Sequence, residues 1–204
     1  MKRNVSIALM STLFMLSALT LAWALKVGTQ APDFTGTDSK GQQQSLAQYR
    51  GKYVVLEWHN QNCPFVRKQY QSGNMEGLQR KWTAKNVVWL SIISSGPGQD
   101  GSVTPEQESA YLAKMHAAPT AVIFDPTGKI GHMYEAKTTP HMFVIDPKGK
   151  LIYEGAIDDQ PTPDPASVKG SKNYVDAALT EDMNGEPVLQ PVTRPYGCSV
   201  KYGD

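Results

Sequence analysis

Hydrophobic residues are grouped in short runs that are separated by polar turns. Three runs rich in β-branched and aromatic residues are between four and seven residues long and carry almost no charge, which predicts buried strands at 53–58, 87–93 and 121–124. Two further runs, His141–Ile145 and Leu151–Gly155, flank a turn that contains proline and glycine, and they predict a β-hairpin. The chain therefore carries the strands of a central sheet.

Helices are predicted between these strands. One begins beside Cys63, where a proline follows in the first turn, and its periodicity continues to Trp82 although Gly73 weakens its middle. Another begins at Thr104, which is followed by a proline and early acidic residues, a pattern typical of a capped helix start. A short helix follows the third strand, and the last helix is predicted at about 172–179.

This alternation of strands and helices predicts the α/β class, with a central mixed β-sheet flanked by helices. Turn formers between Gly28 and Gly51 alternate with short apolar pieces and predict an N-terminal hairpin extension. The C-terminal tail from about residue 187 shows no periodicity and ends near Cys198.

The first 24 residues have the three-part layout of a secretory signal peptide. Lys2 and Arg3 precede a charge-free run at 5–21, and the segment closes on the small-x-small sequence 22–24. We therefore expect a signal peptide at 1–24, one domain at 25–204, and export to a periplasmic or extracellular location. An uncleaved membrane anchor is the alternative, because the run is nearly long enough to cross a bilayer.

Charge and cysteine content narrow the function classes. The formal net charge is +1, and no stretch is dense in lysine and arginine, so nucleic acid is not an expected partner. The two cysteines, Cys63 and Cys198, allow a single bridge, and export would place them where disulfides persist. A domain of this size can fold without a disulfide bond, so the two cysteines form either a structural bridge or a reactive pair.

Cys63 lies at a strand-to-helix junction, where unpaired backbone N–H groups and the helix dipole favour a thiolate. A buried core cysteine is the alternative, but the polar residues at 60–62 favour an exposed turn. Pro140 precedes a hydrophobic strand and donates no hydrogen bond to a sheet, so it must lie at a strand start or carry a special geometry.

The order of these segments resembles the thioredoxin-like superfamily. Within it, the chain is similar to the redoxin branch, the alkyl hydroperoxide reductase and thiol-specific antioxidant proteins, including exported peroxiredoxin-like members. The resemblance spans roughly 27–155 and rests on the opening segment Val27–Phe34, Cys63-Pro64 after a strand, Thr139-Pro140 before a strand, the final hairpin, and the ending Tyr196–Tyr202.

The resemblance implies that Cys63 is the reactive cysteine and that Pro140 is the family's cis-proline, facing it across the site. Two departures stand out. Val66 occupies the place of the second thiol of a Cys-x-x-Cys motif, and Leu56 and Asn60 replace the proline and threonine of the peroxiredoxin motif. Asn60 is expected to donate a hydrogen bond to a peroxide or a sulfenate, and an activating arginine would be Arg67 or Arg194.

Three functions stay open at this point. The first is an exported thiol-dependent oxidoreductase that needs no cofactor, reduces peroxides or protein disulfides through Cys63, uses Cys198 as resolving thiol, and is regenerated by a thiol reductant. The second is a copper or zinc carrier with Cys63, His59 and His141 as ligands. The third is a redox-inactive thioredoxin-like module that binds a peptide at the Pro140 groove.

Overall fold

A computed structural model describes residues 25–203 of the chain. The predicted signal segment 1–24 lies outside the described residues, so its cleavage stays a prediction. Within 25–203, none of the helices combines the length and the apolar character needed to cross a bilayer.

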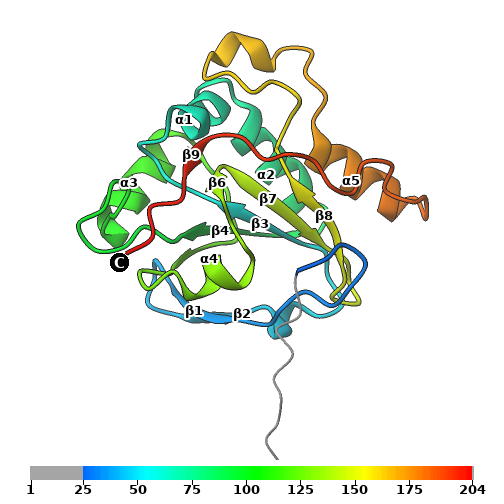
Figure 1. Cartoon of the computed structure of the whole chain (residues 1–204), viewed down its shortest axis with the longest axis horizontal. Helices are drawn as coiled ribbons and strands as arrows, with labels where there is room; N and C mark the ends of the chain where they lie inside the picture. Colours follow the sequence, from blue (N-terminus) through cyan, green and yellow to red (C-terminus); the bar gives the residue numbers. More distant parts are fainter. Residues whose placement is uncertain (1–24, 204) are drawn as a thin grey trace, which may run out of the picture.

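A mixed seven-stranded sheet forms the centre of the molecule, in the order β2-β1-β5-β4-β3-β7-β8 (Figure 1). β3 pairs in parallel with β4 and antiparallel with β7, and all residues of these three strands are buried. The strands are β1 (Thr35–Asp38), β2 (Gln43–Ser45), β3 (Val54–Trp58), β4 (Val88–Ile93), β5 (Ala121–Phe124), β7 (His141–Ile145) and β8 (Leu151–Gly155). The predicted α/β class and mixed sheet are confirmed, and the N-terminal hairpin β1–β2 forms one edge of this sheet.

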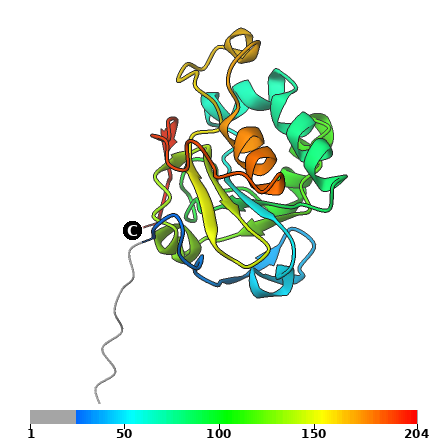
Figure 2. The same cartoon turned by 90° about the vertical axis from the view of Figure 1, so that its right-hand side faces the viewer.

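Helices cover both faces of the sheet. They are α1 (Pro64–Gln71), α2 (Asn74–Thr83), α3 (Pro105–Lys114), α4 (Lys129–Met133) and α5 (Tyr174–Met183), with short 3-10 turns η1 (Ala47–Tyr49) and η2 (Pro165–Val168). Residues of α1, α2 and α5 share one hydrophobic core with Val55, Trp89 and Tyr153 of the sheet. Figure 2 shows α5, in orange, beside the yellow strand β8. Trp58 belongs to the core on the opposite face, which α4 covers.

The prediction of a single helix from Cys63 to Trp82 is wrong, because the chain forms two helices there. Gly73 separates α1 from α2 with a φ of 82°, a left-handed conformation that glycine adopts at little cost. The last helix also differs from its prediction. It begins after Asn173, whose side chain accepts a hydrogen bond from Asp176 N at 2.9 Å, and it continues to Met183.

The aperiodic C-terminal tail is ordered against the rest of the fold. Its strand β9 (Cys198–Ser199) pairs antiparallel with β6 (Thr138–Thr139) in a separate two-stranded sheet. Figure 1 shows this tail in red, crossing from α5 past β6. We call residues 187–203 the C-terminal strap.

Candidate active site

Cys63 is placed by the turn that joins β3 to α1. Cys63 N donates to Asn60 O at 3.0 Å, and the Asn60 side chain accepts from Asn62 N at 2.8 Å. Cys63 is the N-cap of α1, and Pro64 occupies the first helical position, where no N–H is needed. The sulfur therefore lies at a helix N-terminus, where unpaired N–H groups favour a negative charge.

The strap brings Cys198 directly onto this sulfur. The two Sγ atoms are 2.8 Å apart, and both residues are free thiols. Cys63 Sγ also donates to the carbonyl oxygen of Thr139 at 3.0 Å, beside the cis peptide bond between Thr139 and Pro140. The cysteines, which are 135 residues apart in sequence, thus meet at the edge where β6 pairs with β9.

The exposed turn predicted for Cys63 is wrong. The residue is 1% exposed, whereas Cys198 is partly exposed and lies on the outer side of the pair. The polar residues before Cys63 do form a turn, but the strap covers the sulfur. Solvent and substrates therefore approach the pair from the side of Cys198 unless the strap moves.

The two thiols have different acidities. Burial alone would raise the pKa of Cys63, but hydrogen bonds with the side chains of Cys198 and Thr139 and with the backbone N–H groups of Cys198 and Val66 bring that pKa below its ordinary value. Burial, and then the hydrogen bond and charge of Cys63, raise the pKa of Cys198 to about 12. Cys63 is therefore the more acidic thiol of the pair, and its thiolate forms before that of Cys198.

This asymmetry predicts a two-step thiol titration. The ultraviolet absorbance of thiolate should increase in two steps of one equivalent each. The first step, from Cys63, should lie below the ordinary thiol pKa of about 8.5, and the second, from Cys198, should lie near pH 12. Cys198→Ala should move the first step to higher pH, because it removes a donor to the thiolate, whereas Cys198→Ser keeps a hydroxyl donor. Two coincident steps near the ordinary value would contradict the assignment.

Gly197 allows the strap to reach the sulfur of Cys63. Its φ is 140°, and a Cβ at this position would lie 2.1 Å from Thr139 O and 3.3 Å from Pro140 N. Only a residue without a Cβ permits this approach. Further along the strap, Val200 N donates to Lys137 O at 3.1 Å. Cys198 is therefore held on both sides against the loop that carries Pro140.

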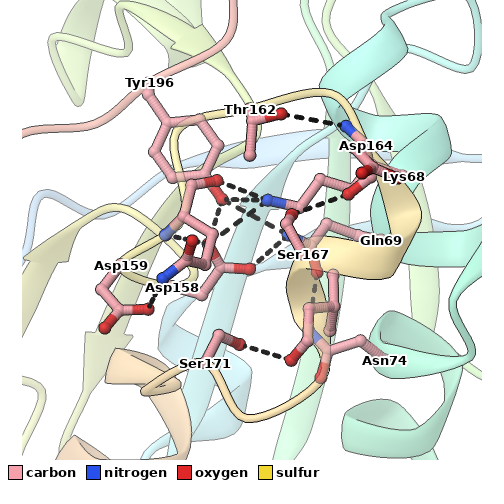
Figure 3. Close-up of polar contacts among 12 residues, drawn as sticks. Lys68, Gln69, Asn74, Asp158, Asp159, Thr162, Asp164, Ser167, Ser171 and Tyr196 are labelled. Atoms are coloured by element: carbon pink, nitrogen blue, oxygen red, sulfur yellow. Dashed lines mark hydrogen bonds and ion pairs between the residues drawn. The ribbon is translucent and has the colours of Figure 1, made fainter.

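A buried polar cluster anchors the strap just before Gly197 (Figure 3). The hydroxyl of Tyr196 contacts Asp158 and accepts from Lys68 Nζ at 3.2 Å. Lys68 Nζ lies 3.5 Å from Asp158 Oδ1 and donates to Gln160 O at 2.5 Å, and Gln69 Nε2 donates to Asp158 Oδ2 at 2.6 Å. Because Lys68 and Gln69 belong to α1, this cluster ties the helix that follows Cys63 to the strap that carries Cys198.

Tyr196→Phe should loosen this anchor. Removing one hydroxyl from a buried network is expected to lower the free energy of unfolding by about 1–3 kcal/mol and to make Cys198 alkylate faster than in the wild type. Urea unfolding and timed alkylation measure the two effects. Tyr174→Phe is the matched control, because the Tyr174 hydroxyl makes no hydrogen bond to any of residues 25–203. Equal effects of both variants would contradict the anchoring role.

The remaining predicted site residues do not contact the sulfur of Cys63. Asn60 is buried, and its Nδ2 donates to Asp100 O at 3.2 Å, so its side chain holds the turn together; its role as a donor to substrate stays a prediction. Arg67 Nε donates to Gln61 O, and both Arg67 and Arg194 are exposed without a hydrogen bond or ion pair to Cys63.

The proposed metal ligands do not converge. Among residues 25–203, no three His, Cys, Asp or Glu side chains are placed to share a metal ion. His141 Nδ1 accepts from Lys137 N at 3.3 Å, and burial, followed by the charge of Lys137, lowers the pKa of His141 to about 3. His59 instead lies between two buried carboxylates, Glu57 and Glu108. The copper or zinc carrier is therefore not supported.

Several residues of the site were missed by the sequence analysis. Glu57 interrupts an otherwise apolar strand, which is a usable signal for a buried acid. Lys68 and Glu108 carry no such signal, because charged residues on a helix usually face solvent. The meeting of Tyr196 with Lys68 depends on tertiary structure alone.

A cavity of about 580 Å³ opens beside the strap. Its walls include Thr138, Asp158, Tyr174 and the strap segment 193–197. It borders the residue before Cys198, so it offers space for a substrate group next to the more exposed thiol.

Comparisons with known proteins agree with this fold. A family model described as the AhpC/TSA family matches residues 27–154. A thiol-disulfide oxidoreductase, ResA, of Geobacillus kaustophilus is 24% identical over 135 residues, which cover 63% of this chain and 68% of the relative. A probable glutathione peroxidase 8-A of Xenopus laevis is 25% identical over 167 residues, which cover 74% of this chain and 78% of the relative.

Among solved structures, a hypothetical protein of Sinorhizobium meliloti has a TM-score of 0.74 at 21% identity. The alignment covers 88% of this chain and 96% of that protein. At this level of identity the likeness concerns the fold. It extends well beyond the region matched by the family model, which ends at residue 154.

Proposed function

Because the chain belongs to the AhpC/TSA family, we propose that it is a thiol-disulfide oxidoreductase whose working couple is Cys63 and Cys198. The observation that carries this proposal is the pair of free sulfurs 2.8 Å apart, one acidic and one protonated. A relative named as a thiol-disulfide oxidoreductase supports the same reaction class.

The reaction consists of two thiol-disulfide exchanges. Because Cys198 and the strap cover Cys63, the strap must first move away from this sulfur. Cys63 thiolate then attacks one sulfur of a substrate disulfide, forms a mixed disulfide and releases the other substrate sulfur as a thiolate. Cys198 then loses its proton and attacks Cys63 Sγ, which closes the Cys63–Cys198 disulfide and releases the second substrate thiolate. The substrate gains two electrons and the dithiol loses two, so an external thiol reductant must restore the pair.

The absent Cys-x-x-Cys motif is explained by the strap. Val66, at the place of the usual second thiol, is fully buried in the core on the α1 side of the sheet. Cys198 instead reaches Cys63 from the C-terminal end of the chain. The second thiol is therefore supplied by the C-terminal strap in place of α1, and it lies on the solvent side of Cys63.

Turnover with a model disulfide tests this function. Reduced protein should reduce insulin disulfides in the presence of a dithiol faster than the dithiol alone. Turnover indistinguishable from the dithiol alone, by correctly folded protein with two free thiols, would overturn the proposal and favour the redox-inactive module.

Peroxide reduction by the same pair is the second candidate, and the match to a probable glutathione peroxidase favours it. Cys63 thiolate would attack the peroxide oxygen, releasing an alcohol or water and leaving a sulfenic acid, which Cys198 would convert to a disulfide with loss of water. Against this candidate, Leu56 and Asn60 replace the peroxiredoxin proline and threonine. Peroxide consumption measured beside disulfide turnover decides between the two substrates.

We also propose export, on the basis of the signal-like segment 1–24. A periplasmic or extracellular location would supply protein disulfides as substrates, and it would require a reductant that operates there.

A further inference from the structure

A buried chain of acid, imidazole and acid lies at the end of β3. His59 Nδ1 is 3.3 Å from Glu57 Oε1, and His59 Nε2 is 3.3 Å from Glu108 Oε1. All three side chains are 0% exposed. Glu57 and His59 come from β3 and the residue that follows it, whereas Glu108 comes from α3.

Glu57 is held as a carboxylate by its surroundings. Its two oxygens accept hydrogen bonds from the side chains of Tyr70, Gln79, Trp89 and Ser91, at 2.8–3.3 Å. Burial would raise the pKa of Glu57, but the hydrogen bond and charge of His59 and the bonds from Trp89 and Tyr70 bring it below its ordinary value. One negative charge is thus fixed on the Nδ1 side of His59.

The carboxyl group of Glu108 has far fewer hydrogen-bond partners than that of Glu57. Neither of its oxygens has a well-aligned hydrogen bond, and the same is true of His59 Nε2 and of the nearby Tyr111 hydroxyl. Four such atoms in one buried place are unusual, because buried polar groups are normally paired. Burial raises the pKa of Glu108, opposed by the charge of His59.

These contacts require a proton between His59 and Glu108. Neutral imidazole has one N–H and one lone pair, and Glu57 takes the N–H at Nδ1. A carboxylate facing the lone pair of Nε2 would be repelled. The proton therefore belongs either to Nε2, giving an imidazolium ion and a carboxylate, or to Glu108, giving neutral imidazole and a carboxylic acid.

His59 precedes Cys63 by four residues, and the charge of Cys63 acts on it. Cys63 N turns back onto Asn60 O, so His59 and Cys63 lie at the same end of β3. The ring of His59 packs against the rings of Tyr70 and Tyr111, with ring centroids 5.4 Å and 5.5 Å apart. Tyr70 belongs to the same hydrophobic core cluster as Cys63. Burial lowers the pKa of His59, but the charges of Glu108, Glu57 and Cys63 outweigh it and raise that pKa. In such a poorly solvated place a charge on one group acts strongly on the other.

We propose, on the premise that Cys63 is the attacking thiol, that His59 is a positioning residue for the reaction. As an imidazolium ion between Glu57 and Glu108 it stabilises the Cys63 thiolate. When disulfide formation removes that negative charge, the proton moves from His59 Nε2 to Glu108. Among residues 25–203, the other ionisable groups packed against the His59 ring are the phenols of Tyr70 and Tyr111; burial raises the pKa of both, so they stay neutral.

Glu108→Gln tests this role through the sign of its effect on Cys63. If Glu108 acted on Cys63 directly, removing a negative charge would lower the thiol pKa. If it acts through His59, the imidazolium ion loses one of its two carboxylates and the thiol pKa rises. The Cys198→Ser background leaves one thiol to titrate by ultraviolet absorbance, and we expect about tenfold less thiolate at a pH below both pKa values.

An unchanged or lowered thiol pKa in Glu108→Gln would overturn the inference. His59→Asn should raise the thiol pKa in the same direction, with His116→Asn as control, because His116 is exposed on a loop. If His59→Asn fails to fold, the Glu108→Gln titration still decides. A depressed Cys63 pKa that neither variant changes would refute the role of His59 and leave the proposed function intact, whereas an ordinary Cys63 pKa in the parent protein would count against the function itself.

Discussion

Cys63→Ser is expected to abolish disulfide turnover, whereas Cys198→Ser is expected to stop the reaction after its first step. Without the Cys63 sulfur, the thiol that remains at the site is Cys198, which lacks the helix N-terminus that favours a thiolate at Cys63 and whose pKa is raised by burial. Without Cys198, the mixed disulfide on Cys63 has no internal thiol to resolve it. Mass spectrometry of the intact protein after exposure to a small disulfide should show one stable adduct in Cys198→Ser, located on Cys63.

Each serine variant serves as the control for the other, because both exchange one sulfur for one oxygen at the same pair. A dithiol should release the adduct from Cys198→Ser and restore the starting mass. Equally fast adduct formation on Cys198 in the Cys63→Ser protein would contradict the assigned order of attack and would make Cys198 the nucleophile.

Gly197→Ala is expected to separate the two thiols. The added Cβ would lie 2.1 Å from Thr139 O, a distance that no rearrangement of the alanine side chain relieves, so the strap must shift. The unusual backbone conformation adds about 1–3 kcal/mol of strain. We expect slower closure of the Cys63–Cys198 disulfide, by at least about tenfold if the shift costs about 1.4 kcal/mol, and a higher pKa of Cys63 because it loses its contact with Cys198.

Gly185→Ala is the matched control for this variant. Gly185 also has a positive φ, of 76°, but a Cβ there would meet no atom within 4 Å. It therefore tests backbone strain without a collision at the site. Rapid acid quenching followed by alkylation measures the rate of disulfide closure, and equal rates in Gly197→Ala and the wild type would contradict the close approach.

The strands and the position of Cys63 at a helix start were predictable because they depend on local pattern. Hydrophobic runs and turn residues placed β3, β4, β5 and the β7–β8 hairpin close to their observed bounds. The capping box at Thr104 is present, with Gln107 N donating to Thr104 Oγ1 at 3.3 Å. The junction at Cys63 follows from the same kind of local signal, a strand followed by a proline-led helix.

The strap could not be predicted in this way. β9 is two residues long and pairs with β6, which is about 60 residues earlier in the chain. A strand this short has no hydrophobic periodicity from which it could be predicted. The burial of Cys63 follows from that pairing, and a reading of its polar neighbours alone gave an exposed turn. Gly73 shows a similar limit: a glycine inside a helical pattern is tolerated or breaks the helix according to its tertiary surroundings.

A redox titration of the whole protein with thiol counting tests whether Cys63 and Cys198 form one redox couple. The protein would be equilibrated in buffers of graded dithiol and disulfide content, alkylated, and analysed by mass spectrometry. We expect a single two-electron transition in which Cys63 and Cys198 lose their thiols together and appear in one cross-linked peptide. Thiols that stay free across the whole series, or a bridge that no buffer reduces in the folded protein, would contradict it.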